Sequence, residues 1–366
     1  MKKKKLKKVI HILGGARPNF IKIAPLLKIL DEHKEFIIKF IHTGQHHDFN
    51  LSTIIFKDLN LRNPDFYLNI NCNSDSQQIA KIMLRYEEII LQKKPELVIV
   101  FGDVNSTIAG ALVAKKLGLK IMHVESGLRS FDESMPEEIN RKITDSISDI
   151  LLTPSKDAYK NLINENISKK KIFNVGNIMI DSLVMCLRKN KEAFNLKRGE
   201  KKIILTFHRP ENVDNKKQFS SIVDLIYDLK TNYKIIFPIH PRAKKNLDNF
   251  GLYKKLSNYK NVNLIKPLGY RDFLITLNSC DFVLTDSGGV QEESTFLKVP
   301  CFTLRKNTER PITITEGTNC LVNLKNVKNK IEKLNISNCK EKKRIYKWDG
   351  KTSIRIVKII EKFFTK

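Results

Sequence analysis

The feature that most constrains the fold is a regular alternation of short apolar runs with helical stretches from one end of the chain to the other. Almost continuously apolar runs are typical of strands buried on both faces of a parallel sheet. The first series lies at 8–14, 36–43, 96–102 and 119–126, with helical apolar spacing at 18–31, 75–93 and 105–117. A second series lies at 201–208, 233–240, 262–268, 281–286 and 299–304. The alternation predicts an α/β fold of two Rossmann-like, doubly wound domains that face each other across a cleft.

A chain of 366 residues is too long for one comfortable hydrophobic core, which favours two domains. No low-complexity linker separates the two series of runs, and we expect the boundary within 175–180. The expected domains are therefore 1–177 and 178–351. A last helix, 352–366, could pack on either half of the chain, and the N-terminal domain is our expectation.

The formal net charge of +27 invites the hypothesis of a nucleic-acid-binding protein. Two features argue against it. The lysines are spread along the whole chain together with abundant Ile and Asn, and the only dense run, Lys2 to Lys8, is short and terminal. Aromatic and basic residues are not interleaved as they are in RNA-binding surfaces. We expect no nucleic-acid partner, and keep nucleic-acid binding as the non-enzyme alternative.

Targeting and redox signals are weak. No apolar run approaches the ~18–20 residues that span a bilayer, and the first apolar stretch runs into glycines without a signal-peptide cleavage pattern. We expect a cytoplasmic protein with no membrane partner. Neither a disulfide framework nor a zinc site is expected, because no Cys-x-x-Cys pair occurs among the scattered cysteines Cys72, Cys186, Cys280, Cys301, Cys320 and Cys339.

Nearly every unusual polar cluster follows an apolar run, where the carboxyl ends of parallel strands bind ligands. Gly14-Gly15-Ala16-Arg17 follows the first run, with Lys22 one to two turns into the next helix. A helix N-terminus with two cations suits phosphate oxygens, but an ordinary turn with a surface lysine explains the pattern equally well. The polar segment 43–48 ends the second run, and is expected either at the rim of the cleft or as a helix cap.

Carboxylates follow two further runs. Asp103 ends one buried run and Glu125 ends the next, where desolvation would raise the pKa of a carboxylate toward the range useful for a base. Asp103 could instead cap the helix at 105, whereas no capping role is available for Glu125. Glu137 and Glu138 open a helix and could serve only its dipole. Because carboxylates repel each other, their convergence on one cleft would indicate catalysis.

In the second half, His208 follows a run at a position that suits ligand binding or proton transfer better than a core role, and His240 has a weaker case. The segment 285–293 gives the strongest signal, because two glycines open a helix whose N–H groups can bind a pyrophosphate. Glu293, one turn later, can accept hydrogen bonds from ribose hydroxyls. The alternative is a plain glycine turn with acidic residues favoured by the helix dipole.

With these residues assembled, the chain resembles the non-hydrolysing UDP-N-acetylglucosamine 2-epimerases over essentially its full length. The resemblance implies the two-Rossmann arrangement of the GT-B type. It rests on ordered motifs whose number makes it specific: GARPNFIKIAPLL, HTGQHHDFN, FGDVNSTIAGAL, HVESGLRSFDESMPEEINR, FHRPENVDN, PLGYRDFL, TDSGGVQEE, TERPITITEGTN and WDGK.

The resemblance also implies roles for individual residues. The domain 1–177 supplies most of the catalytic carboxylates, and 178–351 binds UDP. The implied catalytic set is Asp103, Glu125, Glu137 and His208. The implied substrate-binding residues are Ser287, Gly288 and Gly289 at the diphosphate, Glu293 at the ribose, Phe273 at the uracil, Arg17 and Arg310 near the phosphates, and Lys22 and Arg141 close to the catalytic set.

Such enzymes are thought to eliminate UDP across C1–C2 of the sugar to give 2-acetamidoglucal, and then to add UDP back with protonation of C2 from the opposite face. This chemistry needs an acid and a base with separated pKa values, and neither a metal nor another cofactor. The expected substrate is therefore UDP-N-acetylglucosamine, and a homodimer is the expected assembly.

Relatives that act on a UDP-2,3-diacetamido uronic acid carry a similar LRSFD–MPEEINR segment, so the sugar is less determined than the reaction. Two further enzymes remain as alternatives. One is a hydrolysing epimerase, against which MPEEINR argues. The other is a GT-B glycosyltransferase, which would require an acceptor.

Overall fold

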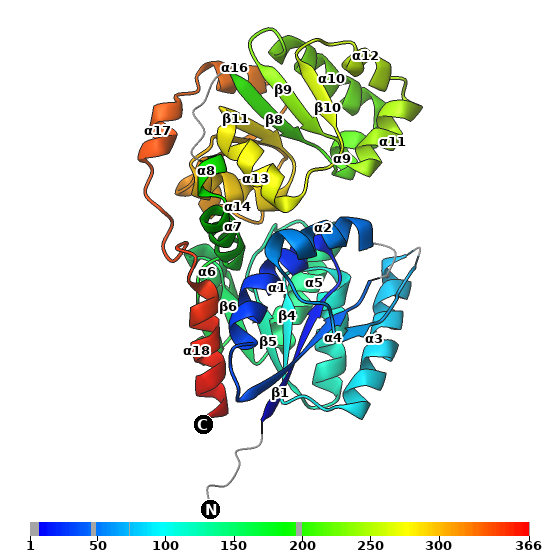
Figure 1. The fold of residues 1–366 in the computed structure, drawn as a ribbon, viewed down its shortest axis with the longest axis vertical. Helices are drawn as coiled ribbons and strands as arrows, with labels where there is room; N and C mark the ends of the chain where they lie inside the picture. Colours follow the sequence, from blue (N-terminus) through cyan, green and yellow to red (C-terminus); the bar gives the residue numbers. More distant parts are fainter. Residues whose placement is uncertain (1–6, 45–48, 73, 195–199, 366) are drawn as a thin grey trace, which may run out of the picture. The chain divides into compact units, whose positions relative to one another are not determined.

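The computed structural model describes residues 7–44, 49–72, 74–194 and 200–365. Contacts within the chain divide it into two compact units (Figure 1). Unit 1 comprises Met1–Met185 and Tyr346–Lys366, and unit 2 comprises Cys186–Ile345. The division falls inside helix α7 (Ile178–Lys189) and not at the expected position 177/178, because this helix runs across it without a break.

Unit 1 is built on a sheet of parallel strands in the order β3-β2-β1-β4-β5-β6-β7. Its strands are β1 (Lys8–Gly14), β2 (Phe36–His42), β3 (Phe66–Tyr67), β4 (Leu97–Phe101), β5 (Lys120–Val124), β6 (Ile150–Thr153) and β7 (Ile172–Asn174). Its helices are α1 (Arg17–Leu30), α2 (Phe49–Leu59), α3 (Asp75–Gln92), α4 (Asn105–Lys116), α5 (Pro136–Ile147), α6 (Lys156–Asn164), the first part of α7 and α18 (Thr352–Phe364), with a 3-10 turn at Lys169–Lys171.

The central strands of unit 1 are buried on both faces. All five residues of β4 are fully buried, as the unbroken apolar run predicted. Helix α1 packs against α2 and α18, whereas α4 packs against α3 and α5 (Figure 1). The helices around the sheet thus form two separate packing groups. A doubly wound fold has such an arrangement, as predicted from the sequence.

Unit 2 repeats the same strand order, β10-β9-β8-β11-β12-β13, again with parallel pairing. Its strands are β8 (Lys202–Thr206), β9 (Lys234–Pro238), β10 (Val262–Ile265), β11 (Phe282–Thr285), β12 (Cys301–Leu304) and β13 (Asn319–Val322). Its helices are α8 (Lys191–Phe194), α9 (Pro210–Val213), α10 (Lys216–Leu229), α11 (Pro241–Asn249), α12 (Tyr253–Ser257), α13 (Tyr270–Ser279), α14 (Gly288–Leu297), α15 (Ile312–Thr315), α16 (Val327–Glu332) and α17 (Ile336–Glu341).

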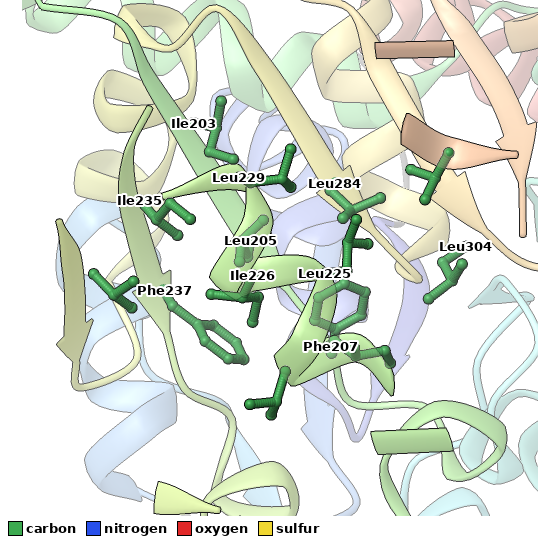
Figure 2. Packing of buried hydrophobic residues seen from close by; sticks show 14 of the residues in the cluster. Ile203, Leu205, Phe207, Leu225, Ile226, Leu229, Ile235, Phe237, Leu284 and Leu304 are labelled. Atoms are coloured by element: carbon green, nitrogen blue, oxygen red, sulfur yellow. The ribbon is translucent and has the colours of Figure 1, made fainter. Parts of the chain in front are cut away.

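The core of unit 2 lies between its sheet and α10 (Figure 2). Ile203 and Leu205 of β8 and Phe237 of β9 are fully buried against Ile226 of the helix. Burying a side chain of this size contributes about 1.5–3 kcal/mol. All nine apolar runs that were predicted as strands form strands in the two sheets.

The C-terminal segment is fixed to unit 1 by three buried contacts. The indole N–H of Trp348 donates to the carbonyl of Pro154 at 3.0 Å. The Asp181 carboxylate of α7 accepts from the backbone N–H groups of Thr352 and Ser353 at 3.0 and 2.7 Å, which caps the N-terminus of α18. Helix α18 thus packs on the N-terminal unit, and the returning segment starts at residue 346.

In each unit the strand order reverses next to the first strand, between β1 and β4 in unit 1 and between β8 and β11 in unit 2. Ligands of open α/β sheets bind at such reversals, beyond the carboxyl ends of the strands. All six cysteines are free. Across the described residues, the helices are too short or too polar to cross a membrane.

Candidate active site

The turn after β1 is filled by the protein's own side chains. The side-chain oxygen of Asn19 accepts from the N–H groups of Gly15 and Ala16, both at 3.3 Å, and its amide group donates to the carbonyl of Phe101. A Cβ at Gly15 would lie 2.0 Å from Thr43 Oγ1 and 2.1 Å from Ser106 Oγ, so only glycine fits. Two amides of this turn are therefore already bonded, which favours an ordinary strand-to-helix turn. Arg17 is exposed at the start of α1.

Lys22 and Glu125 form a buried ion pair, which excludes the interpretation of Lys22 as a surface lysine. Their side chains are only 6% and 4% exposed. Glu125 follows β5 with a left-handed backbone, φ 69°, which places its side chain beside β4. Gly102 passes next to the pair, because a Cβ on it would lie 2.8 Å from Lys22 Nζ and 3.2 Å from the Glu125 carboxylate.

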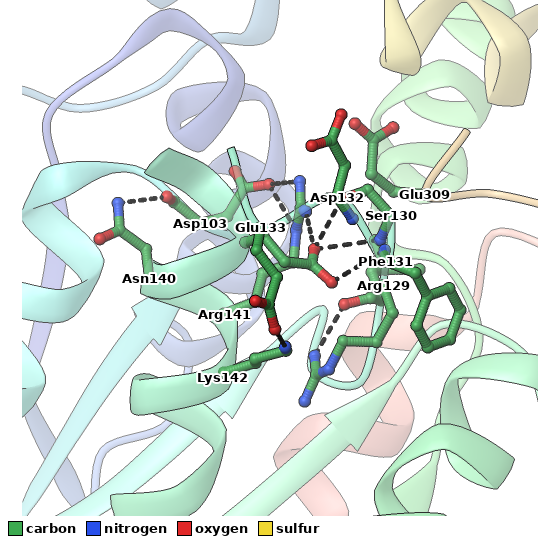
Figure 3. A network of polar contacts seen from close by, with 12 residues as sticks. Asp103, Arg129, Ser130, Phe131, Asp132, Glu133, Asn140, Arg141, Lys142 and Glu309 are labelled. Carbon is green, nitrogen blue, oxygen red and sulfur yellow. Dashed lines mark hydrogen bonds and ion pairs between the residues drawn. The ribbon is translucent and has the colours of Figure 1, made fainter. Parts of the chain in front are cut away.

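Asp103 does not cap α4, because the N-cap residue of that helix is Val104. Its Oδ2 accepts from Arg141 Nε at 2.9 Å and from Arg141 Nη2 at 2.5 Å (Figure 3). Asn140 of α5 donates to the Asp103 carbonyl at 2.9 Å. The structure thus brings together Asp103 and Arg141, two of the predicted site residues, and buries Arg141 to 4% exposure.

Glu137 and Glu138 share the first turn of α5 but have opposite environments. Glu137 is exposed, whereas Glu138 is 1% exposed and accepts from Ser130 N, Ser130 Oγ, Phe131 N and Arg141 Nη1. Burial alone would raise the pKa of Glu138, but these donors hold it below its ordinary value. Glu138 therefore does more than interact with the helix dipole.

His123 and Asp145 lie beneath these groups, and sequence reasoning missed both. His123 is fully buried, with Nδ1 2.7 Å from Asp145 Oδ1 and Nε2 2.8 Å from the carbonyl of Gly102. A carbonyl can only accept, so Nε2 carries a hydrogen and donates to it. His123 thereby fixes the turn between β4 and Asp103. The polar residue in the otherwise apolar run 119–126 was the signal that could have revealed it.

In unit 2, His208 lies at the strand-order reversal, beside a buried aspartate. Nδ1 of His208 lies 3.0 Å from Asp286 Oδ1, and the backbone N–H groups of His208 and Arg209 donate to the same carboxylate. Burial alone would raise the pKa of Asp286, but the bonds from His208, Arg209 and Asn212 hold it below its ordinary value. Asp286 belongs to the motif TDSGGVQEE but was not predicted as a site residue.

Helix α14 begins at the glycine pair beyond β11, with Ser287 as its N-cap residue. Arg310 lies over this end, because a Cβ at Gly288 would be 2.6 Å from Arg310 Nη1. Arg310 pairs with Glu292 at 3.0 Å and with Glu309 at 3.4 Å. Glu293 is 4% exposed on the same helix. The predicted residues Ser287, Gly288 and Arg310 are therefore neighbours.

Glu309 lies among three arginines. Arg305 makes two bonds to it, at 2.9 and 2.8 Å, and Arg209 and Arg310 each lie 3.4 Å away. Burial alone would raise the pKa of Glu309, but these cations hold it far below its ordinary value. The cluster concentrates positive charge near the start of α14, where an anion would be attracted.

Three other sequence features were expected near the site: Phe273, His240 and the polar segment 43–48. Phe273 is half-buried on α13 and packs against the hydrophobic cluster that contains Leu277 and Val283. His240 caps α11, since its Nδ1 accepts from Arg242 N at 3.2 Å. Of the polar segment 43–48, residues 45–48 lie outside the described part of the chain.

Among the residues that the structure describes, one group of side chains could hold a metal ion, although no metal-ligand cluster was expected. His33, Glu35 and Glu361 each offer a ligand atom, and these atoms lie within 4.8 Å of one another. The contacts are explained without an ion, because His33 Nδ1 lies 3.0 Å from Glu35 Oε1 and 3.6 Å from Glu361 Oε1.

Comparison with known proteins shows which family the chain belongs to. A sequence profile of the family described as UDP-N-acetylglucosamine 2-epimerase matches residues 28–361. The chain belongs to this epimerase family. A relative from Methanococcus maripaludis, described as a UDP-N-acetylglucosamine 2-epimerase homolog, is 46% identical over 96% of this chain and 99% of its own length. The resemblance predicted from the motifs is therefore confirmed, and the chain is an enzyme of the isomerase class.

Two further proteins are similar to this chain over most of its length. A crystal structure of Methanocaldococcus jannaschii UDP-GlcNAc 2-epimerase in complex with UDP-GlcNAc and UDP matches with a TM-score of 0.86 and 43% identity, over 97% of this chain and 99% of that one. A Pseudomonas aeruginosa protein described as UDP-2,3-diacetamido-2,3-dideoxy-D-glucuronate 2-epimerase is 41% identical over 86% of this chain and 88% of its own length.

Proposed function

We propose that the protein interconverts UDP-N-acetylglucosamine and UDP-N-acetylmannosamine by inverting C2 of the sugar. The observation that carries the proposal is the pair of strand-end carboxylates, Asp103 and Glu125, each held by a buried cation, in a chain of the 2-epimerase family. A carboxylate held in a fixed orientation next to a cation is suited to accept and return a proton at one position.

Unit 1 carries the proton chemistry in this proposal. Asp103, Glu125 and the exposed Glu137 are the proposed acid and base groups, and Lys22 and Arg141 offset their mutual repulsion. A base removes the C2 proton while the C1–O bond to UDP breaks, which leaves 2-acetamidoglucal. UDP then adds back to C1, and an acid on the other face gives a proton to C2. The atoms balance, because UDP leaves with the electron pair of the C1–O bond and returns it on re-addition.

Unit 2 binds the nucleotide in this proposal. The N-terminus of α14 with Ser287, Gly288, Gly289 and Arg310 suits the diphosphate, since the positive end of a helix and a guanidinium both favour negative charge. Departing UDP gains negative charge, so the same groups stabilise the transition state. Glu293 is proposed at the ribose, Phe273 at the uracil and Arg17 near the phosphates.

His208 completes the proposed catalytic set. Its Nδ1 is engaged by Asp286, so Nε2, on the opposite side of the ring, is the nitrogen left to meet a ligand. The side chain is 39% exposed, which lets it reach a substrate. An imidazole in a fixed tautomer can donate to or accept from UDP as it leaves and returns.

The second candidate substrate is UDP-2,3-diacetamido-2,3-dideoxy-D-glucuronate, because a protein described by that 2-epimerase activity is 41% identical to this chain. The reaction would be the same and only the sugar would differ.

The homodimer also stays a proposal, which light scattering of the purified protein would test.

The test offers each UDP-sugar to the purified protein and follows both reactions by proton NMR. We expect UDP-GlcNAc to yield UDP-ManNAc. Turnover of the uronate alone would contradict the sugar assignment and keep the reaction.

Glu137→Gln addresses the mechanism, because loss of one proton-transfer group should let the enzyme release 2-acetamidoglucal and UDP. A variant with normal product and rate would exclude Glu137 from the chemistry.

A further inference from the structure

We infer that Glu138 is a positioning residue, which fixes the catalytic carboxylate of Asp103 through the guanidinium of Arg141. The inference rests on the proposed function, because it assumes that Asp103 takes part in the proton chemistry. Glu138 is not among the predicted site residues, and its exposed neighbour Glu137 is. The following contacts, all within unit 1, carry it.

Glu138 joins a loop to the helix that holds Arg141. Its Oε2 accepts from Ser130 N and Ser130 Oγ, each at 3.0 Å, and its Oε1 accepts from Phe131 N at 3.1 Å. The same Oε2 accepts from Arg141 Nη1 at 2.5 Å, one turn further along α5. The carboxylate is 1% exposed, so solvent does not compete for these bonds. Glu138 therefore has one fixed position.

Arg141 passes that fixed position on to Asp103. One edge of its guanidinium, Nε and Nη2, donates to Asp103 Oδ2 (Figure 3). The third nitrogen, Nη1, donates to Glu138. A guanidinium is a rigid plane, so holding Nη1 sets the rotation of the whole group. Asp103 follows the left-handed Gly102 and is the more exposed end of the chain of contacts, with 24% of its side chain exposed.

The arrangement explains why a buried carboxylate is present here at all. The positive charge of Arg141 could neutralise Asp103 by itself. The second buried carboxylate, Glu138, therefore needs another explanation, because burying a charge costs free energy unless a partner offsets it. A second carboxylate on the far side of Arg141 leaves the triad with a net negative charge, so Asp103 is not fully offset by a single cation. It also removes the rotational freedom that would let Asp103 move relative to C2. A displacement of about 1 Å at a reacting group can cost about 100-fold in rate.

The matched test compares Glu138→Gln with Glu165→Gln. Both remove a carboxylate that accepts from a buried arginine, but the arginine bound by Glu165 is Arg129, which reaches Asp103 only indirectly, through Asp145 and His123. Asp145 keeps its bonds to His123 and to Gly127 N when Glu165 is changed. Glutamine at 138 has a single acceptor oxygen. At the Oε2 position it meets Ser130 and Arg141 as a neutral acceptor and turns its NH₂ group toward Phe131 N, and at the Oε1 position it turns its NH₂ group toward Ser130 and Arg141; either way the ion pair with Arg141 is lost. We expect Glu138→Gln to lower kcat by about 10- to 100-fold with KM changed less than about 2-fold, and Glu165→Gln to keep kcat.

A double-mutant cycle separates positioning from a purely structural role. If Glu138 acts through Asp103, Asp103→Asn and the double variant Asp103→Asn/Glu138→Gln should turn over at similar rates, because nothing remains to be positioned. Losses that multiply in the double variant, a raised KM with normal kcat, or an equal loss in Glu165→Gln would each overturn the inference. Melting curves of every variant exclude unfolding as the cause of a lost rate.

A measurement without turnover keeps the inference separate from the proposed function. The Arg141 Nε–H signal in ¹⁵N NMR, assigned through Arg141→Lys, should exchange slowly in the wild-type protein and in Glu165→Gln. It should exchange faster in Glu138→Gln, since the guanidinium is then released. Unchanged exchange contradicts the inference. A wild-type protein that shows this coupling but does not convert UDP-GlcNAc contradicts the proposed function instead.

Discussion

Gly102 joins β4 to Asp103 and passes directly beside the Lys22–Glu125 ion pair. Its backbone is left-handed, φ 64°, and its carbonyl accepts from the buried His123. A left-handed backbone costs about 1–2 kcal/mol for a residue with a Cβ. Space is the second constraint, because a Cβ here would approach Lys22 Nζ to 2.8 Å. Gly118 offers a matched comparison, with φ 68° and nothing within 4 Å of an added Cβ.

We predict that Gly102→Ala and Gly118→Ala lose similar amounts of stability from backbone strain but differ in turnover. The added methyl at 102 should push Lys22 away from Glu125 and lower kcat by about 10-fold or more, whereas Gly118→Ala should keep it. Melting temperatures and steady-state rates of the two variants are the measurement. Equal rates would show that the ion pair tolerates displacement and has no part in catalysis.

The sequence indicated the polar residues of this region but not their pairing. The sequence left two alternatives for Lys22, a phosphate ligand and a surface lysine, and its buried ion pair with Glu125 excludes the surface lysine. The Lys22–Glu125 and Asp103–Arg141 pairs join residues far apart in the chain, and no spacing rule connects them. Glu137 and Glu138 are adjacent and chemically identical, so only the fold separates the exposed carboxylate from the buried one.

At the scale of elements, the turns before α1 and α14 are both bonded from within the chain. Gly15 and Ala16 donate to Asn19 Oδ1 before α1, and Ser287 N donates to Thr285 Oγ1 before α14. Beside α14, a Cβ at Gly288 would lie 2.6 Å from Arg310 Nη1. Asn19 is the residue that the sequence argument overlooked, because a phosphate site and a self-capped turn share the same glycines. Arg310, held beside Gly288 by Glu292 and Glu309, is why we propose the diphosphate at α14.

We predict that Gly288→Ala weakens UDP binding about 10-fold, because the new methyl would lie 2.6 Å from Arg310 Nη1 and displace the guanidinium from the helix end. Glu292 and Glu309 hold Arg310, so it cannot simply turn aside. Calorimetric titration with UDP measures the effect. Gly251→Ala, where nothing lies within 4 Å of the added Cβ, serves as the control and should bind UDP normally. Equal affinities in the two variants would remove the diphosphate from α14.

Strands that the sequence did not reveal are short ones near the sheet edges. β3 has only two residues, and β6, β7 and β13 have three or four. β3 and β7 are too short to show a period, and pairing with a longer neighbour defines them, as Leu151 of β6 does for Ile172 of β7. β6 and β13 are as long as the predicted strands β10, β11 and β12, so length does not explain why they were missed. The long central strands were predictable because burial on both faces requires an unbroken apolar run.

At the scale of the whole molecule, buried carboxylates with lowered pKa values occur in both units. Glu138 and Asp145 belong to unit 1, and Asp286 and Glu309 belong to unit 2. In each case burial alone would raise the pKa, and bonds to arginine, histidine or backbone N–H groups outweigh it. Their folded-state pKa values lie below the unfolded values, so the unfolded chain binds more protons in acid.

We predict that stability is nearly constant around neutral pH and falls as the pH drops from about 5 to 3, through and below the unfolded carboxylate values. Glu309→Gln should be less stable at pH 7 by about 3–5 kcal/mol, because it leaves buried arginines without their carboxylate. Its loss of stability between pH 5 and 3 should be smaller than that of the wild-type protein. Denaturant unfolding at several pH values measures both, and parallel curves for the two proteins would contradict the lowered pKa of Glu309.

The proposed reaction inverts C2 of a UDP-linked N-acetylhexosamine by removing and returning a proton. The most direct measurement is a proton NMR time course of UDP-GlcNAc with the wild-type protein in heavy water. We expect UDP-ManNAc to appear and the C2 hydrogen of both sugars to be replaced by deuterium. The same mixture should form from either sugar. Free N-acetylmannosamine and UDP as the main products, or epimerisation that keeps the C2 hydrogen, would contradict it.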